Sequence, residues 1–234
     1  NLASALALSG EEAEAVGAYR EALRLDPLNP ELHEWFNGYL STLAHPEYLH
    51  SYAEALDQHP DAGPLAIAYA RKLLLGQQGE QALQVLAAVP IDEEQTRAYL
   101  ACERSHIFRE MGEFDEAVIA AREAHRLLQD LPRNTLELAT AIMAADADYE
   151  EAVDCLQPLI SSEACGQDTW ATYATALRYA ERRDEYNQIV DYEKYVGIRH
   201  IETPEGYDSL TAFLQAARNH LMSLHITRHH PVGQ

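Results

Sequence analysis

The stretch Arg109–Ala124, which reads REMGEFDEAVIAAREA, decides the fold. A glycine turn at Gly112 precedes Ala117, Ala121 and Ala124, whose spacings of four and three residues place small side chains on one face of a helix. Similar triplets of small or apolar residues return every 33 to 35 residues, beginning at Ala15, Tyr48, Ala82, Ala117 and Ala152, and the pair Tyr186 and Val190 continues the series. This period indicates a structural repeat whose units bury their apolar faces against one another.

A second apolar stripe precedes each triplet and completes the repeat. In the last unit it comprises Trp170, Tyr173, Ala174 and Leu177, and glycines at Gly10, Gly76–Gly79 and Gly112 mark turns where we expect a left-handed residue. The pattern resembles tetratricopeptide repeats, in which each unit is a pair of helices. The resemblance implies an all-α fold, a right-handed superhelix of about six helix pairs, with the first repeat truncated.

The pattern changes after residue 194. Residues 195–202 read YVGIRHIE, with β-branched Val196, Ile198 and Ile201 and no helical stripe, which predicts a short strand. A helix is predicted from about residue 208 to residue 225, with Asp208 or Ser209 as its cap. We therefore expect a repeat array over residues 1–194 and the incomplete start of a second domain over residues 195–234.

The C-terminal segment carries a second resemblance. The series from Val190 through Pro204–Tyr207 (PEGY) to His230–Gln234 (HPVGQ) is similar to the start of the catalytic domain in bacterial 2-oxoglutarate and Fe(II)-dependent oxygenases, where a tetratricopeptide array often comes first. This implies that Fe(II), 2-oxoglutarate and every catalytic residue belong to a downstream domain, and that this chain holds no cofactor. The alternative is a free-standing adaptor with no catalytic domain.

Composition narrows the partners. The chain has 38 acidic residues against 17 Lys and Arg, a net charge of −21, so nucleic acid and anionic membranes are not expected partners. The three cysteines lack zinc-site or redox-motif spacing, and His220, His225, His229 and His230 lack a neighbouring carboxylate, so we expect no metal site. Without a signal segment or membrane span in the sequence, we expect a cytoplasmic protein.

The resemblance to tetratricopeptide repeats also predicts a binding face. In such arrays the first helix of each pair lines the concave surface, and four positions of each unit point into it. These positions hold Arg71, Tyr99, His106, Arg109, Glu137 and Arg178, together with Leu74, His33 and Asn37. Arginines there suit a protein or peptide partner with an acidic or C-terminal carboxylate group. The competing interpretation is that they pair with nearby glutamates and recognise nothing, and self-association is a further option.

Overall fold

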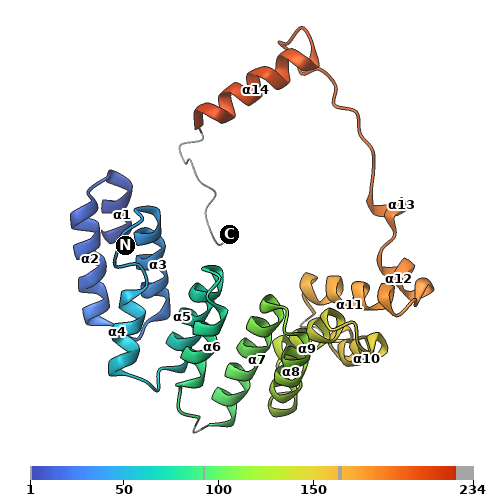
Figure 1. Cartoon of the computed structure of the whole chain (residues 1–234). Helices are drawn as coiled ribbons and strands as arrows, with labels where there is room; N and C mark the ends of the chain where they lie inside the picture. The colour runs from blue at the N-terminus through green and yellow to red at the C-terminus, as the bar shows by residue number, and fades with distance from the viewer. Residues whose placement is uncertain (1, 92, 163–164, 225–234) are drawn as a thin grey trace. The chain divides into compact units, whose positions relative to one another are not determined.

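The computed structural model describes residues 2–91, 93–162 and 165–224, and every regular element in these ranges is an α-helix. The helices up to residue 189 form consecutive pairs (Figure 1): α1 (Leu2–Ser9) and α2 (Glu12–Leu25), α3 (Pro30–Thr42) and α4 (His50–Gln58), α5 (Gly63–Leu75) and α6 (Gly79–Ala87), α7 (Glu94–Met111) and α8 (Phe114–Leu127), α9 (Pro132–Ala144) and α10 (Tyr149–Ile160), α11 (Gln167–Tyr179) and α12 (Arg183–Ile189). The all-helical prediction is confirmed for this part of the chain.

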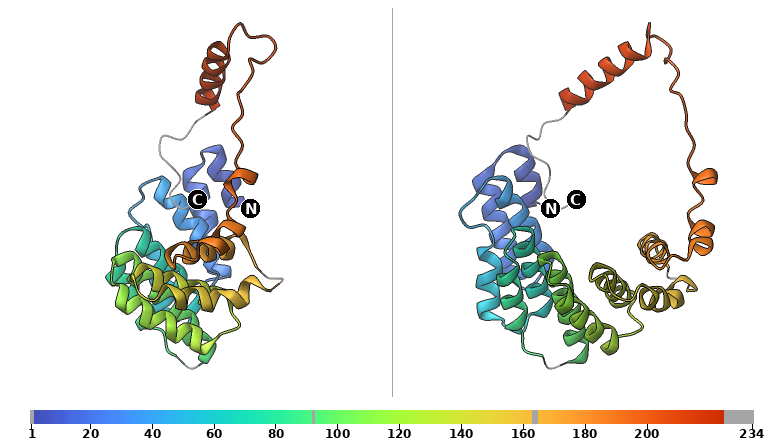
Figure 2. Two further views of the ribbon diagram at one scale, coloured as in Figure 1. Left: turned by 90° about the vertical axis from the view of Figure 1, so that its right-hand side faces the viewer. Right: turned by 45° about the vertical axis from the view of Figure 1, so that its right-hand side comes forward.

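From α1 to α12, helices that follow one another in the chain also lie side by side, as the views of Figures 1 and 2 agree. In addition, the first helices of successive pairs, α3, α5, α7, α9 and α11, each pack against the next. Each repeat therefore buries its apolar face on its neighbours, which is the packing that a helical repeat needs because one pair alone has no core.

Small side chains make the closest helix contacts. Four of the predicted triplets begin with a fully buried alanine: Ala15, Ala82, Ala117 and Ala152. In α8, Ala121 and Ala124 are also fully buried, and Ala124 packs with Ala101 and Cys102 of α7. A methyl group fills the space between two close helices without forcing them apart, so these positions fix the register of the stack.

The turns within the pairs use a left-handed residue, but it is not always the glycine. At the end of α7, Gly112 has a φ of 83°, and the Glu113 amide donates to the Phe108 carbonyl at 2.9 Å. Between α5 and α6 the left-handed residue is Gln77, with a φ of 59°, whereas Gly76 has a φ of −80°. The expectation that glycine supplies the left-handed residue is therefore wrong at this turn, where the same turn geometry is kept at a cost of about 1 kcal/mol.

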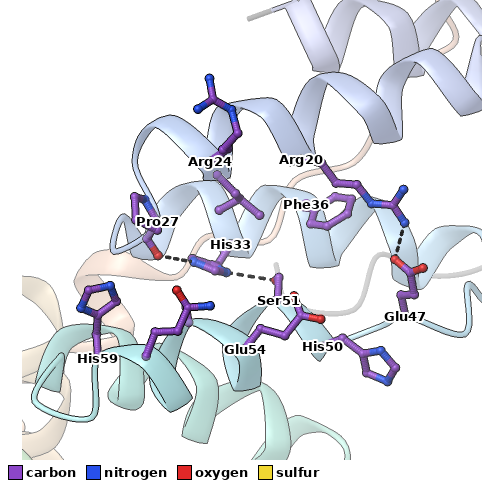
Figure 3. A pocket seen from close by; sticks show the side chains of 13 residues that line it. Arg20, Arg24, Pro27, His33, Phe36, Glu47, His50, Ser51, Glu54 and His59 are labelled. Atoms are coloured by element: carbon purple, nitrogen blue, oxygen red, sulfur yellow. Dashed lines mark hydrogen bonds and ion pairs between the residues drawn. The ribbon is translucent and has the colours of Figure 1, made fainter.

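A buried polar network joins α3 to α4 and to the turn before α3. His33 Nε2 donates to the Pro27 carbonyl at 2.8 Å, and its Nδ1 lies 3.0 Å from Ser51 Oγ (Figure 3). Asn37 Nδ2 donates to the same Ser51 Oγ at 2.8 Å, and the Leu49 amide donates to Asn37 Oδ1 at 2.6 Å. His33 and Asn37, which the sequence predicted on the binding face, are buried and hydrogen-bonded within the repeat.

This environment keeps His33 neutral. Burial disfavours the imidazolium and lowers the pKa of His33 from its ordinary value of 6.5, against the smaller opposite effect of the hydrogen bond to the Pro27 carbonyl. Because Nε2–H is used by that carbonyl, Nδ1 accepts from the Ser51 hydroxyl. Protonation of Nδ1 would remove this acceptor, so the network depends on the neutral ring.

Residues Val190–Gln234 form a second compact unit, which is described up to residue 224. It contains α13 (Tyr192–Tyr195) and α14 (Leu210–Leu224), and the Ser209 hydroxyl caps α14 by accepting from the Ala212 amide at 3.2 Å. Residue 225 of the predicted helix and the HPVGQ motif at 230–234 lie outside the described residues. The assignment of residues 195–234 to an oxygenase-like domain stays a prediction.

The predicted strand over residues 195–202 is wrong. After Tyr195 the chain is irregular, and Val196, Ile198 and Ile201 are 62%, 90% and 64% exposed. A strand needs a partner to pair its backbone N–H and C=O groups, and no described segment offers one. A β-branched composition alone does not supply that partner.

Substitution of Ala121 by tryptophan is expected to destabilise the array. The methyl group is fully buried within a core cluster, and overpacking a core typically costs about 1 to 3 kcal/mol. Thermal unfolding followed by circular dichroism should show a lower midpoint. Ile119→Trp on the same helix is the matched control, since Ile119 is 68% exposed, and equal midpoints for the two variants would contradict the packing described above.

Acidification is expected to weaken the array through His33. Since the folded pKa of His33 lies below 6.5, the unfolded chain binds the extra proton first, so stability present at neutral pH is lost as the pH falls through 6.5 toward the folded value. Urea unfolding midpoints measured between about pH 7.5 and pH 5 should fall less steeply for His33→Gln than for the wild type. The comparison is needed because burial also lowers the pKa of His125, which contributes with the same sign. Parallel curves for the two proteins would rule out His33 as the cause.

Candidate functional site

The candidate site lies on the first helices of three successive repeats. Helix α7 packs against both α5 and α9, so side chains from these three helices meet along one face. Of the residues predicted from the sequence, this brings Arg71 of α5, His106 and Arg109 of α7, and Glu137 of α9 into two charged clusters that both involve α7.

The first cluster is centred on a glutamate that the sequence-based prediction missed. Glu103 of α7 is 1% exposed and accepts hydrogen bonds from arginines on both neighbouring helices. Arg71 of α5 donates through Nε at 3.0 Å and through Nη2, and Arg133 of α9 donates through Nη2. One carboxylate therefore links three repeats.

Glu103 is ionised despite its burial. Burial alone raises the pKa of a carboxyl, but the hydrogen bonds and positive charges of Arg71 and Arg133 outweigh it and hold the pKa of Glu103 below its ordinary value of 4.5. Two guanidinium groups against one carboxylate leave the cluster with one net positive charge. A buried carboxylate that is paired with two arginines has its charge compensated, whereas the loss of both arginines would leave a buried charge without a partner.

The second cluster surrounds Arg109. Its Nη2 donates to His106 Nδ1 at 2.8 Å, its Nη1 to Glu110 at 3.0 Å, and its Nε lies 3.5 Å from Glu137 Oε1. The same Glu137 oxygen accepts from the Ser105 hydroxyl at 2.9 Å. Because a guanidinium only donates, His106 Nδ1 accepts, and its proton is on Nε2. The pairing of Arg109 with glutamates is the arrangement that the competing interpretation describes.

The other two predicted residues lie apart from these clusters. Tyr99 is half-buried in α7, and its hydroxyl accepts from Gln95 Nε2 at 3.1 Å. Arg178 is exposed on α11, and within the described ranges its side chain has no hydrogen bond or ion pair. Arg178 is therefore the predicted arginine whose charge is not already engaged by a neighbouring glutamate.

Glu103 and Arg133 were missed because only four positions of each repeat were considered. Glu103 lies four residues after Tyr99 and three before His106, so a helical stripe of spacing four and three already connects it to two predicted residues. Arg133 follows the proline that begins α9, one turn before Glu137. Helical spacing thus gave a usable signal for Glu103, whereas Arg133 required the packing of α9 on α7.

A hollow of about 630 Å³ lies between α2, α3 and α4 (Figure 3). Its apolar lining residues include Leu23, Phe36 and Ala55. Its charged lining residues are Arg20, Arg24, Glu47 and Glu54. Arg20 is paired with Glu47, and Arg24 with Glu21 outside the hollow. The two arginines and two glutamates cancel in charge, and the lining also contains His33, His50 and His59. None of the six predicted site residues contributes to the hollow.

The described residues contain neither a metal-site cluster nor a helix that could span a membrane. Within residues 2–91, 93–162 and 165–224, no three His, Cys, Asp or Glu side chains come together as a metal site. Of the terminal histidines, His225, His229 and His230 lie outside these ranges. The helices described are each too short or too polar to cross a bilayer.

Comparison with known proteins identifies the fold. No family model matches the sequence, and no curated protein matches it. Among solved structures, a tetratricopeptide repeat protein from Parabacteroides merdae is 15% identical with a TM-score of 0.58, covering 84% of this chain and 78% of its own. The tetratricopeptide repeat protein TTC0263 of Thermus thermophilus is 22% identical with a TM-score of 0.54, and the match covers 76% of this chain and 96% of that one. A chain of the APC/C hetero-tetramer Cut9–Hcn1 is 16% identical in sequence with a TM-score of 0.56, and the match covers 81% of this chain and 38% of that one. The chain has the tetratricopeptide repeat fold.

Proposed function

We propose that this chain is a protein-interaction scaffold that binds a peptide or protein across the first helices of its repeats. The observation that carries the proposal is the face formed by α5, α7 and α9, where charged side chains from three repeats gather around α7. The fold supports it, because stacked helix pairs present extended surfaces and supply no catalytic group of their own. The hetero-tetramer of Cut9 and Hcn1 is a protein assembly that contains a similar array.

We infer that the helix pairs wind into a right-handed superhelix with the first helices on its concave side. The direct packing of α3, α5, α7, α9 and α11 on one another supports this arrangement. In it, Arg71, Tyr99, His106, Arg109, Glu137 and Arg178 share one concave surface. Such a surface suits an extended segment that contacts several repeats in turn.

The chemistry of the face favours a partner with acidic groups. Arg178 offers a complete set of guanidinium donors, and Arg71 and Arg133 share a single carboxylate. Self-association is a further proposal, in which a single exposed carboxylate of a second copy of the chain would be the acidic group. The net charge of −21 argues against nucleic acid, whose binding depends on neutralising phosphates.

We further propose that the scaffold is the interaction region of a 2-oxoglutarate and Fe(II)-dependent oxygenase and recruits or positions that enzyme's partner. The sequence resemblance of residues 190–234 supports this link, and the iron and 2-oxoglutarate would be held by a downstream domain. The competing proposal is a free-standing adaptor. The codons that follow Gln234 distinguish the two: a His-x-Asp or His-x-Glu motif with a distant second His supports the oxygenase, whereas a stop codon or further helical repeats exclude it.

Charge reversal at Arg178 is the direct test of the binding face. Because this side chain is exposed and unpaired among the described residues, Arg178→Glu should leave the thermal midpoint unchanged and weaken the binding of acidic peptides by about fivefold or more. Fluorescence anisotropy with a panel of labelled acidic and neutral peptides measures the effect. Arg183→Glu makes the same charge change on the second helix of the same pair and should bind as the wild type does. Equal binding by all three proteins would exclude the first-helix face.

A further inference from the structure

We propose that the Arg71–Glu103–Arg133 cluster is a subsite for one carboxylate of the bound peptide, and that the peptide around this carboxylate is neutral or basic. Arg71 and Arg133 are the binding residues, and Glu103 is the positioning residue that holds them. The inference rests on the proposed function and deepens it, because it names the anchoring atoms and the class of ligand.

The cluster leaves hydrogen-bond donors free on its exposed side. The guanidinium of Arg71 uses Nε and Nη2 for Glu103, and that of Arg133 uses Nη2, out of five N–H donors on each. The arginine side chains are 49% and 47% exposed, whereas Glu103 is 1% exposed. The carboxylate therefore lies beneath the two guanidinium groups, and the donors that it does not use remain available to a ligand.

Glu103 prepares the arginines for binding. A free arginine side chain carries about 2 kcal/mol of rotamer entropy, part of which is lost when a ligand fixes it. Here the buried carboxylate on α7 fixes both guanidinium groups before any ligand arrives, and the two arginines come from different helices, α5 and α9. The ligand then binds to two guanidinium groups whose orientation is already fixed.

Charge determines how many carboxylates the ligand carries. The cluster has one surplus positive charge, which suits one carboxylate. The rest of the protein brings the net charge to −21, and the neighbouring glutamates Glu34 and Glu137 are already partnered by Lys72 and Arg109. A polyacidic segment would feel this negative field over the Debye length of about 8 Å, whereas one carboxylate in contact with two arginines gains locally. Neutral or basic flanks are therefore favoured.

The competing explanation is that the cluster only joins three repeats. A buried ion cluster of this kind is weak evidence for added stability, and breaking it by removing one partner is strongly destabilising. Binding must therefore be measured on variants that leave no buried charge unpaired. The triple variant Arg71→Gln/Glu103→Gln/Arg133→Gln meets this condition, because it removes the buried carboxylate together with both arginines.

Two arginines outside the cluster provide a matched control. Arg97 pairs with Glu123 and Arg122 pairs with Glu151, and these arginine side chains are 50% and 55% exposed. The variant Arg97→Gln/Arg122→Gln thus removes two half-exposed, ion-paired arginines without touching the cluster. Surface ion pairs of this kind contribute little to stability, so the control should fold as the wild type does.

The probes are biotinylated octapeptide pools with randomised flanks and either Glu or Gln at the central position. Each pool is made with neutral and basic flanks or with acidic flanks, and with a free or an amidated C-terminus. Binding to the full chain is measured by biolayer interferometry at about 0.15 M salt, and circular dichroism midpoints are recorded for every protein.

We expect a carboxylate-bearing pool with neutral and basic flanks to bind the wild type and the control about tenfold more tightly than the amidated Gln pool. On the triple variant this preference should fall to within about twofold. Preference for the central Glu identifies a side-chain carboxylate, and preference for the free C-terminus identifies a terminal one; either result supports the subsite.

Three results would overturn the inference. An undiminished carboxylate preference in the folded triple variant would place the anchor elsewhere, and tightest binding of the acidic-flank pools would refute the single-carboxylate ligand. Peptides that bind with no carboxylate preference but lose affinity in Arg178→Glu would refute the subsite while sustaining the proposed function. If no pool binds the wild type, both the subsite and the proposed peptide-binding function fail.

Discussion

The structure depends on one constraint: a pair of short helices cannot bury its apolar face alone. Every repeat must therefore lie close against the next, and the buried alanines of the recurring triplets allow that approach. This requirement leaves the outer surfaces of the helices free to vary. The charged clusters around α7 are built on that freedom, since they occupy the first-helix face without disturbing the apolar contact between α7 and α8.

The two charged clusters show how the same residue types serve different ends. Arg109 is surrounded by His106, Glu110 and Glu137 and retains little capacity for a ligand. Arg71 and Arg133 instead share one carboxylate that is hidden beneath them, so their combined charge is only half compensated. An arginine on a binding face is thus informative only when its partners and the exposure of those partners are known.

The sequence was sufficient for the fold and for part of the candidate site. Periodicity identified the helix pairs because buried positions such as Ala117 and Ala121 recur at helical spacing, and packing enforces that spacing. Burial of His33 and Asn37 was not predictable, because it depends on Ser51 and Leu49 of the next helix and its turn. The pairing of Arg133 with Glu103 likewise depends on how α9 packs on α7. At residues 195–202, β-branched composition was misleading because local preference cannot create a hydrogen-bonding partner.

Glu103 has a consequence for how the array comes apart. In a solenoid, each unit normally communicates only with the units beside it, so one end can fray while the other stays intact. A single side chain held from α5 and α9 at once connects units that are next-nearest neighbours. We therefore expect the middle repeats to open together as one cooperative block, and local opening to begin at the two ends.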